Sequence, residues 1–278
     1  MLISCPDRPG IVARVSNFLF EYGANITESA QHTTDPQGGM FFMRVAFDLP
    51  RTADSEAALC ERFAPVAAAF SMRWRLSYPA RKKRMAILVS REDHCLQELL
   101  WQHRTGTLKA EIPFVISNHP DHEASVSQFG IPYHHIPVDR QDRRRAEERQ
   151  LELLREGADF AVLARYMQIL SPLVVSAMPE RIINIHHSFL PAFVGARPYE
   201  RAYERGVKII GATAHYVTEE LDAGPIIEQD VQRIHHGHSV REMKSVGRQI
   251  ERTVLARAVR WHIEDRILVH ENKTIIFT

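Results

Sequence analysis

Two polar side chains stand close together where an apolar run of the chain ends. The run 182–185 is apolar except for Asn184, and His186 follows it directly. Because side chains alternate along a strand, Asn184 and His186 share one face of the strand expected here. An Asn amide can donate to a developing oxyanion, and a His can transfer protons near neutral pH. The same spacing also fits two hydrogen-bonded polar groups that merely end a strand.

A carboxylate that could serve such a histidine lies further along the chain. Residues 218–222 form an acidic loop after the strand expected over 209–217, and Gly224-Pro225 then restart an extended run. At the tip of this loop, Asp222 could pair with an imidazole and stabilise its charged form. An ordinary solvated loop acid is the competing interpretation.

The first 80 residues have the pattern of a small α+β domain. Apolar residues at helical spacing and alternating apolar runs predict its elements. Helices are expected over 11–22 and 54–70, and strands over 2–4, 25–33, 39–47 and 72–78. The order strand, helix, strand, strand, helix, strand is that of a ferredoxin-like fold.

A basic run, residues 81–84, is expected to be a solvated linker to a second domain over 85–278. In this domain apolar runs alternate with helical patterns. Strands are expected over 85–89, 112–117, 135–138, 160–163, 182–185 and 209–217, helices over 93–104, 141–156 and 239–264, and a closing hairpin over 267–270 and 274–277. This alternation predicts an open, mainly parallel α/β sheet.

Composition argues against nucleic-acid-binding, membrane-spanning and secreted proteins. The chain has 278 residues and a formal net charge of +1, from 35 Lys and Arg against 34 Asp and Glu. A near-neutral chain has no global field for gripping nucleic acid, and no apolar run approaches the roughly 20 residues of a membrane helix. The N-terminus lacks the basic region of a signal peptide, and the three scattered cysteines, Cys5, Cys60 and Cys95, fit a cytoplasmic protein.

Several sites of common chemistry are missing from the sequence. There is no GxGxxG, no GxxxxGK[ST] and no GxSxG motif. Two histidine groups, 186–187 and 235–238, could suggest a metal site, but divalent sites need three or four converging ligands. We expect residues 235–238 to form a polar loop and the protein to bind no metal.

Taken together, Asn184-x-His186 with Leu190-Pro191, and Leu221-Asp222-x-Gly224-Pro225, resemble the signature of the folate-dependent formyltransferase family. The resemblance implies that Asn184, His186 and Asp222 are catalytic and that a formyl-folate is the one-carbon donor. His187 and His215 become secondary active-site residues. Residues 164–172 resemble the folate-binding strand end and loop of that family. This implies folate contacts from Arg165, Met167, Gln168, Ile169 and Leu170, with Met167, Ile169 and Leu170 lining the pterin pocket.

The N-terminal segment resembles an ACT domain. Asp7-Arg8-Pro9-Gly10 before the first helix and Gly23-Ala24-Asn25-Ile26 after it carry the likeness. ACT domains commonly pair and bind small amino acids where they pair. The resemblance implies a homodimer or homotetramer and an effector such as glycine or methionine at Asp7, Gly10, Asn25 and Ile26. ACT domains usually have a longer first strand inside the sheet. A strand over only 2–4 therefore indicates either a chain start downstream of the true one or a sheet short of backbone partners.

An ACT domain ahead of a formyltransferase-like domain is the arrangement of the family's formyl-folate hydrolases, and the likeness covers essentially the whole chain. It implies hydrolysis of 10-formyltetrahydrofolate to formate and tetrahydrofolate, which supplies formate for one-carbon and purine metabolism. The formyl-folate is then substrate, and no cofactor is expected.

Two alternatives remain. A phosphoribosylglycinamide formyltransferase would hold its acceptor's phosphate with a Gly-rich loop, whereas residues 90–94 have no glycine and two carboxylates. The other alternative is a non-catalytic amino-acid sensor.

Overall fold

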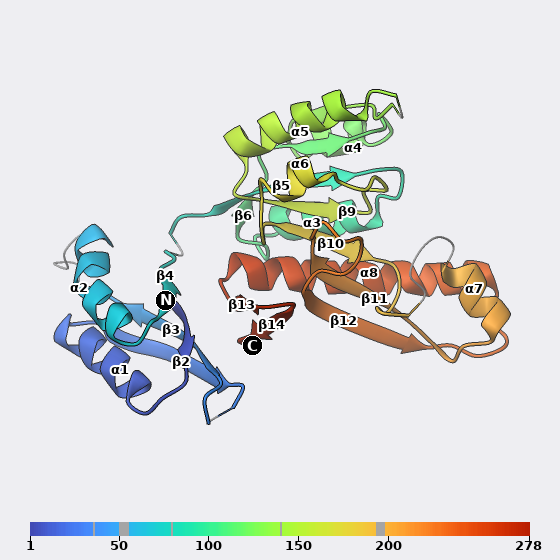
Figure 1. Cartoon of the computed structure of the whole chain (residues 1–278). Helices are drawn as coiled ribbons and strands as arrows, with labels where there is room; N and C mark the ends of the chain where they lie inside the picture. The colour runs from blue at the N-terminus through green and yellow to red at the C-terminus, as the bar shows by residue number, and fades with distance from the viewer. Residues whose placement is uncertain (36, 50–55, 79, 140, 193–197) are drawn as a thin grey trace. The chain divides into compact units, whose positions relative to one another are not determined.

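The computed structural model describes residues 1–35, 37–49, 56–78, 80–139, 141–192 and 198–278 (Figure 1). The contacts divide the chain into two units. Unit 1 comprises Met1–Pro79, Asp265–His270 and Ile275–Thr278, and unit 2 comprises Ala80–Glu264 and Glu271–Thr274. The sequence-based division assigned all of 85–278 to the second domain, whereas residues 265–270 and 275–278 lie in unit 1.

Unit 1 has the predicted ferredoxin-like order. Its elements are β1 (Leu2–Pro6), α1 (Ile11–Glu21), β2 (Asn25–Thr33), β3 (Met40–Asp48), α2 (Glu56–Ala69) and β4 (Arg73–Arg75). The sheet order is β2-β3-β1-β4 with antiparallel neighbours. The fold of unit 1 is confirmed, and residues 54–55 of the second predicted helix lie outside the described residues.

The first strand differs from the prediction. β1 runs to Pro6 rather than Ser4, and it lies inside the sheet. It pairs with β3 from Leu2 to Pro6 and with β4 from Leu2 to Ser4. The expected shortage of backbone partners is therefore wrong. A proline at the end of a strand is tolerated because only its own N–H is lost from the ladder.

The two faces of this sheet are covered differently. Ile3 and Val45 on one face pack with Phe18 of α1 and Phe63 of α2. On the other face, Leu2 and Phe42 pack with Phe277 near the end of the chain. The same C-terminal part of unit 1 brings Asp265 to the guanidinium of Arg75, and Arg266 lies 3.2 Å from Glu28. The last two strands are β13 (Ile267–His270) and β14 (Lys273–Ile276), which pair only with each other.

Unit 2 is built on a mixed, mostly parallel sheet, as predicted. Its strands are β5 (Lys83–Val89), β6 (Ala110–Glu111), β7 (Val115–Ser117), β8 (Tyr133–His135), β9 (Phe160–Ala164), β10 (Ile182–His186), β11 (Ile209–Tyr216) and β12 (Ile226–Arg233). The order is β12-β11-β10-β9-β5-β7-β8, with β6 beside β5. β11 is antiparallel to both of its neighbours, and the other pairs are parallel.

Several strand bounds differ from the prediction. β4 and β7 are shorter than the predicted 72–78 and 112–117. β8 lies two residues earlier than the prediction of 135–138, because its register follows the short β7, with Tyr133 opposite Val115. Lys83 and Arg84, expected in the linker, begin β5 instead. Asp159 holds Arg84 there, accepting from its backbone N–H at 2.8 Å and from its guanidinium at 3.1 Å.

The helices of unit 2 are α3 (His94–Arg104), α4 (Glu123–Ser127), α5 (Arg143–Gly157), α6 (Pro172–Val175), α7 (Pro198–Arg205) and α8 (Val240–Ile263). The three longest were predicted; α4, α6 and α7 were not. Ser239 and Glu242 form a capping box that starts α8. Figure 1 shows α5 and α6 on one side of the sheet and α8 on the other, against β10, β11 and β12.

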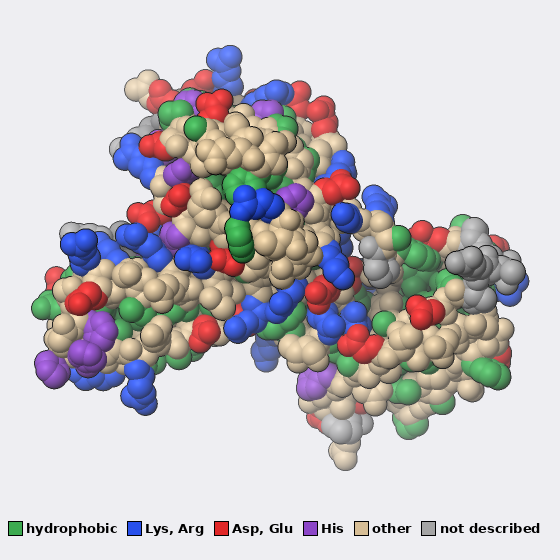
Figure 2. Space-filling view, turned by 180° about the vertical axis from the view of Figure 1, so that it is seen from behind, with side chains coloured by type: hydrophobic (Ala, Val, Ile, Leu, Met, Phe, Trp, Pro, Cys, Tyr) green, Lys and Arg blue, Asp and Glu red, His purple; other side chains and the backbone are tan. Residues whose placement is uncertain are grey.

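Surface charge agrees with the near-neutral composition. Figure 2 shows Lys and Arg side chains lying among Asp and Glu side chains over the face that it presents. None of the helices in the described part of the chain combines the length and apolar composition that a membrane crossing requires.

Candidate active site

The sheet of unit 2 brings the three predicted catalytic side chains together. Asn184 and His186 come from the end of β10, and Asp222 comes from the loop that follows β11. β11 lies beside β10 in antiparallel register, with His215 opposite Asn184. Polar groups at the carboxyl ends of strands are where open α/β sheets place their sites.

His186 and Asp222 form a buried pair. Nδ1 of His186 lies 3.2 Å from Oδ2 of Asp222, and the side chains are 6% and 10% exposed. The hydrogen bond from His186 is the main cause that holds the pKa of the Asp222 carboxyl well below its usual range. Nε2 of His186 is buried and has no hydrogen-bond partner among the described residues. A neutral imidazole that donates from Nδ1 keeps its lone pair on Nε2, so this atom is available to a substrate or a water.

His215 orients Asn184. Nδ1 of His215 donates to the carbonyl oxygen of Tyr216 at 2.9 Å, so the neutral ring accepts at Nε2. The amide nitrogen of Asn184 donates there at 3.2 Å. Since an amide carries two N–H bonds, one remains for an oxyanion. The carboxylate of Asp222 also lies 3.7 Å from Nε2 of His215, so Asp222 adjoins both His186 and His215.

The loop that carries Asp222 depends on its glycine. Asp222 has a φ of 56°, a left-handed conformation that Asp tolerates better than most residues. A Cβ on Gly224 would lie 1.9 Å from the carbonyl oxygen of Tyr216. The backbone N–H of Tyr216 donates to the carbonyl of Pro225 at 2.9 Å. Gly224 thus lets the loop close tightly on the end of β11, which fixes the position of Asp222.

The predicted folate-binding residues follow β9 and are presented unevenly. Met167 and Ile169 are each 57% exposed, whereas Leu170 is 8% exposed and packs in the core. Gln168 is half-buried between them. Arg165 has a φ of 62°, and its Nε lies 3.4 Å from Glu251. The exposed side chains of Met167 and Ile169 are suited to contact a planar ring. Arg165 instead pairs with Glu251.

Buried hydrogen bonds anchor this segment. The hydroxyl of Ser90 accepts from the backbone N–H of Met167 at 2.9 Å. At the other end, the buried carboxylate of Glu147 accepts from the N–H of Ser171 at 3.0 Å and from its hydroxyl at 2.5 Å. Both anchors come from elements outside the segment, so its shape is set before a ligand arrives.

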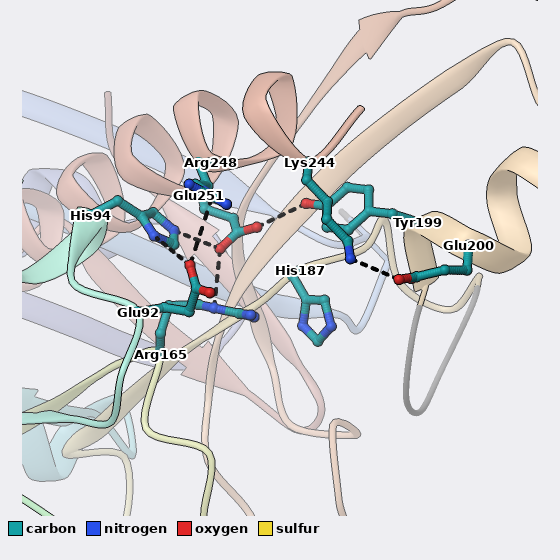
Figure 3. Close-up of a pocket in the computed structure, with 9 residues that line it drawn as sticks. All are labelled: Glu92, His94, Arg165, His187, Tyr199, Glu200, Lys244, Arg248 and Glu251. Atoms are coloured by element: carbon teal, nitrogen blue, oxygen red, sulfur yellow. Dashed lines mark hydrogen bonds and ion pairs between the residues drawn. The ribbon is translucent and has the colours of Figure 1, made fainter. Parts of the chain in front are cut away.

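A polar pocket of about 190 Å³ adjoins the histidines (Figure 3). Its lining residues are Glu92, His94, Arg165, His187, Tyr199, Glu200, Lys244, Arg248 and Glu251. His187 links it to the catalytic group, because it follows His186 and their ring centroids are 5.3 Å apart. Burial lowers the pKa of His187 to about 4, helped by the charge of Arg165, so this ring is neutral at neutral pH.

Glu251 is the centre of the pocket, and it was not among the site residues predicted from the sequence. The side chain is 2% exposed. It accepts from the hydroxyl of Tyr199 at 2.8 Å and lies 2.8 Å from Nε2 of His94. Burial alone would raise the pKa of Glu251, but the hydrogen bond from His94 and the charge of Arg165 lower it overall. A Cβ on Gly247 would lie 1.9 Å from the Tyr199 hydroxyl oxygen. A glycine four residues before a helical glutamate was the one signal in the sequence.

Part of this pocket could bring metal ligands together. His94, Cys95 and Glu251 place ligand atoms within 4.8 Å of one another. Burial raises the pKa of the Cys95 thiol well above its usual value, and metals bind the thiolate. The carboxylate already has partners in His94, Tyr199 and Arg165. The donor set therefore suits a hydrogen-bonded cluster better than a cation.

The predicted effector residues of unit 1 form two separate groups. Asp7 lies at one end of β2, where its carboxylate accepts from the hydroxyl of Thr33 at 2.6 Å. Gly10, with a φ of 94°, lies three residues after Asp7 and directly precedes α1. Asn25 and Ile26 begin β2, so roughly 25 Å of strand separates them from Thr33. Within one copy of the chain, the two groups do not meet.

Comparison with known proteins gives each unit a family. Residues 83–259 match the family model described as formyl transferase, and residues 1–63 match the ACT domain model. Fold and site together place the chain in the formyl transferase family, with an ACT domain ahead of the formyl transferase domain.

Individual relatives are more specific. Formyltetrahydrofolate deformylase from Bacillus subtilis is 58% identical over 278 residues, which is 100% of this chain and 93% of that protein. The crystal structure of a formyltetrahydrofolate deformylase from Pseudomonas syringae superposes with a TM-score of 0.96 at 50% identity, covering 100% of this chain and 93% of that one. Glycinamide ribonucleotide transformylase 1 from Symbiobacterium toebii gives a TM-score of 0.67 at 29% identity, covering 74% of this chain and 99% of that one. The chain belongs to the formyltetrahydrofolate deformylase family.

Proposed function

We propose that this protein hydrolyses 10-formyltetrahydrofolate to formate and tetrahydrofolate. The observation that carries the proposal is the buried His186–Asp222 pair beside Asn184, in a chain that is 58% identical over its whole length to a formyltetrahydrofolate deformylase. The non-catalytic sensor is disfavoured because Asn184 is hydrogen-bonded to His215 and the His186–Asp222 pair lies beside the same ring, so the three side chains meet at one place.

In the first step, water attacks the carbon of the formyl group. The carbonyl oxygen becomes an oxyanion, and Asn184 donates to it with the N–H that His215 leaves free. Losing one such donor typically costs about 10²–10³ in rate. Met167 and Ile169 contact the pterin, which holds the formyl group near these donors.

His186 moves the proton. Its free Nε2 accepts a proton from the attacking water, and the resulting imidazolium pairs with the Asp222 carboxylate. The proton then passes to N10 of the folate as the C–N10 bond breaks, releasing formate and tetrahydrofolate. Acid–base help of this kind contributes about 10²–10⁴. The network supplies both an oxyanion donor and a proton carrier, so we expect full activity after treatment with a chelator.

The test follows formate and tetrahydrofolate release from 10-formyltetrahydrofolate, with and without glycinamide ribonucleotide. We expect formate without the acceptor, and loss of this activity in His186→Ala. Turnover only with glycinamide ribonucleotide would make the protein a transformylase. Amino-acid binding without turnover in either assay would make it a sensor.

Unit 1 is proposed to bind a small amino acid, glycine or methionine, where two ACT domains pair. The separation of Asp7 and Gly10 from Asn25 and Ile26 supports this, because a second copy could bring one group to the other. We expect a homodimer or homotetramer in light scattering, and saturable binding of one of these amino acids in calorimetry. The reaction is expected in the cytoplasm, since all three cysteines are free.

A further inference from the structure

The polar pocket centred on Glu251 has no role in the mechanism described so far. We propose that this pocket is the acceptor side of the active site, and that its paired charges exclude an anionic acceptor and so reserve it for water. The inference rests on the proposed function and names the residues that determine acceptor specificity.

The pocket lies beside the catalytic group and apart from the apolar folate-binding side chains. His187 lines the pocket (Figure 3). Its ring lies against that of His186, so the pocket meets the catalytic group there. On the segment after β9, Arg165 lines the pocket, whereas Met167 and Ile169 expose apolar side chains. The apolar part suits an aromatic donor. The pocket, lined by charged and polar side chains, suits a small polar acceptor.

The charges of the pocket are paired. Among the residues that the structure describes, three cations line the pocket, and each has a carboxylate within 4 Å. The pairs are Arg165 with Glu251 at 3.4 Å, Lys244 with Glu200 at 2.7 Å and Arg248 with Glu92 at 3.7 Å. His187 adds no charge at neutral pH because its pKa is about 4. Among these described lining residues, a phosphate entering here would meet as many carboxylates as Lys and Arg side chains.

Hydrogen bonding to a buried residue fixes part of this charge arrangement. Tyr199 and Glu200 are neighbours in the first turn of α7. The hydroxyl of Tyr199 is bonded to the buried Glu251, in space that Gly247 leaves open. Fixing Tyr199 therefore also fixes Glu200 beside Lys244. Water needs only donors and acceptors and can use this pocket, whereas a phosphate must first separate an ion pair.

The test measures binding of inorganic phosphate to the full chain by calorimetry, at constant ionic strength and without folate. The variant is Glu92→Gln with Glu200→Gln, whose side chains are 48% and 33% exposed and can be changed without opening a core. We expect the double variant to bind phosphate at least tenfold more tightly than the unmodified protein. The matched control, Glu148→Gln with Glu152→Gln on α5, removes the same charge elsewhere and should behave like the unmodified protein.

A third substitution tests whether the phosphate binds in this pocket. Adding Arg248→Ala to the double variant should remove most of the gain, because it removes a cation that Glu92→Gln leaves unpaired. If the double variant is poorly folded, each single substitution should still tighten phosphate binding about threefold.

The inference is overturned if the double variant binds phosphate no more tightly than its control, or if the unmodified protein binds it equally well. Because the measurement needs no turnover, it is independent of formate release. Failure to release formate would overturn the proposed function and leave the phosphate comparison readable.

Discussion

Oδ2 of Asp222 lies 3.2 Å from Nδ1 of His186, and the opposite ring nitrogen, Nε2, is buried without a partner in the described part of the chain. Burying a nitrogen that makes no hydrogen bond costs free energy. A protein can retain such an atom where a bound ligand supplies the missing hydrogen bond. In the proposed reaction, this pair therefore sets the direction of proton transfer, and the substrate lies at Nε2.

Replacing Asp222 with Asn should lower kcat by about 10²–10⁴, because a neutral amide cannot stabilise the imidazolium formed on His186. KM should change by less than about threefold, since the lost interaction strengthens only in the transition state. Steady-state formate release measures both. Glu220→Gln, in the same loop, is the control and should be nearly unchanged. A kcat for Asp222→Asn within twofold of the unmodified protein would remove Asp222 from the mechanism.

Gly224→Ala should lower kcat more than tenfold. The new Cβ has no room beside the carbonyl of Tyr216, so the loop must shift and take Asp222 with it. Small misplacements of catalytic groups can cost about 10² in rate. The measurement is kcat together with a thermal melt. Gly237→Ala, whose Cβ would meet only the side chain of His235 at 3.1 Å, is the control. Equal kcat values for the two variants would contradict this role for Gly224.

Glu147→Gln should raise KM for 10-formyltetrahydrofolate about three- to tenfold while kcat stays nearly constant, the pattern of lost uniform binding. Its two carboxylate oxygens hold Ser171, and a Gln offers one acceptor and no charge. Loosening this end should release Met167 and Ile169 from their positions. Glu148→Gln, the exposed neighbour, provides the comparison. An unchanged KM would show that Ser171 does not depend on this anchor.

His187 should make stability depend on pH. Its pKa is about 4 in the folded protein against 6.5 for a free histidine, with burial as the main cause and Arg165 as the second. Between these values the unfolded chain binds a proton that the folded chain does not, so stability falls as pH decreases from about 7 to about 4. Urea unfolding near pH 7.5 and pH 5 should show a larger loss for the unmodified protein than for His187→Gln. Parallel losses would mean that His187 is not held neutral.

Much of the site could be predicted because it follows strand ends. Alternation along β10 puts Asn184 and His186 on one face, and the acidic loop after β11 supplies Asp222. The contact between them requires that β11 pair with β10, which the sequence does not specify. His215 could be named from its place in a motif, but its hydrogen bond to Asn184 depends on that antiparallel register.

The Glu251 pocket could not be predicted in this way. Glu251 lies among charged residues in α8 and has the appearance of a solvated position. Its partner Tyr199 is 52 residues away, in the eight-residue helix α7, which spans only about two turns. Only the tertiary packing of α7 on α8 reveals that Gly247 leaves space for the tyrosine. The short helices α4 and α6 were missed for the same reason of length.

The two faces of the unit 1 sheet have a consequence for how the protein is made. Phe42 and Leu2 leave the ribosome early, but Phe277, which covers them, is synthesised after all of unit 2. Domains generally fold as they emerge, with N-terminal ones first. Here the apolar face of the first unit must stay uncovered during almost the whole of translation. Unit 1 is thus completed last, only on a chain whose unit 2 has already been made in full.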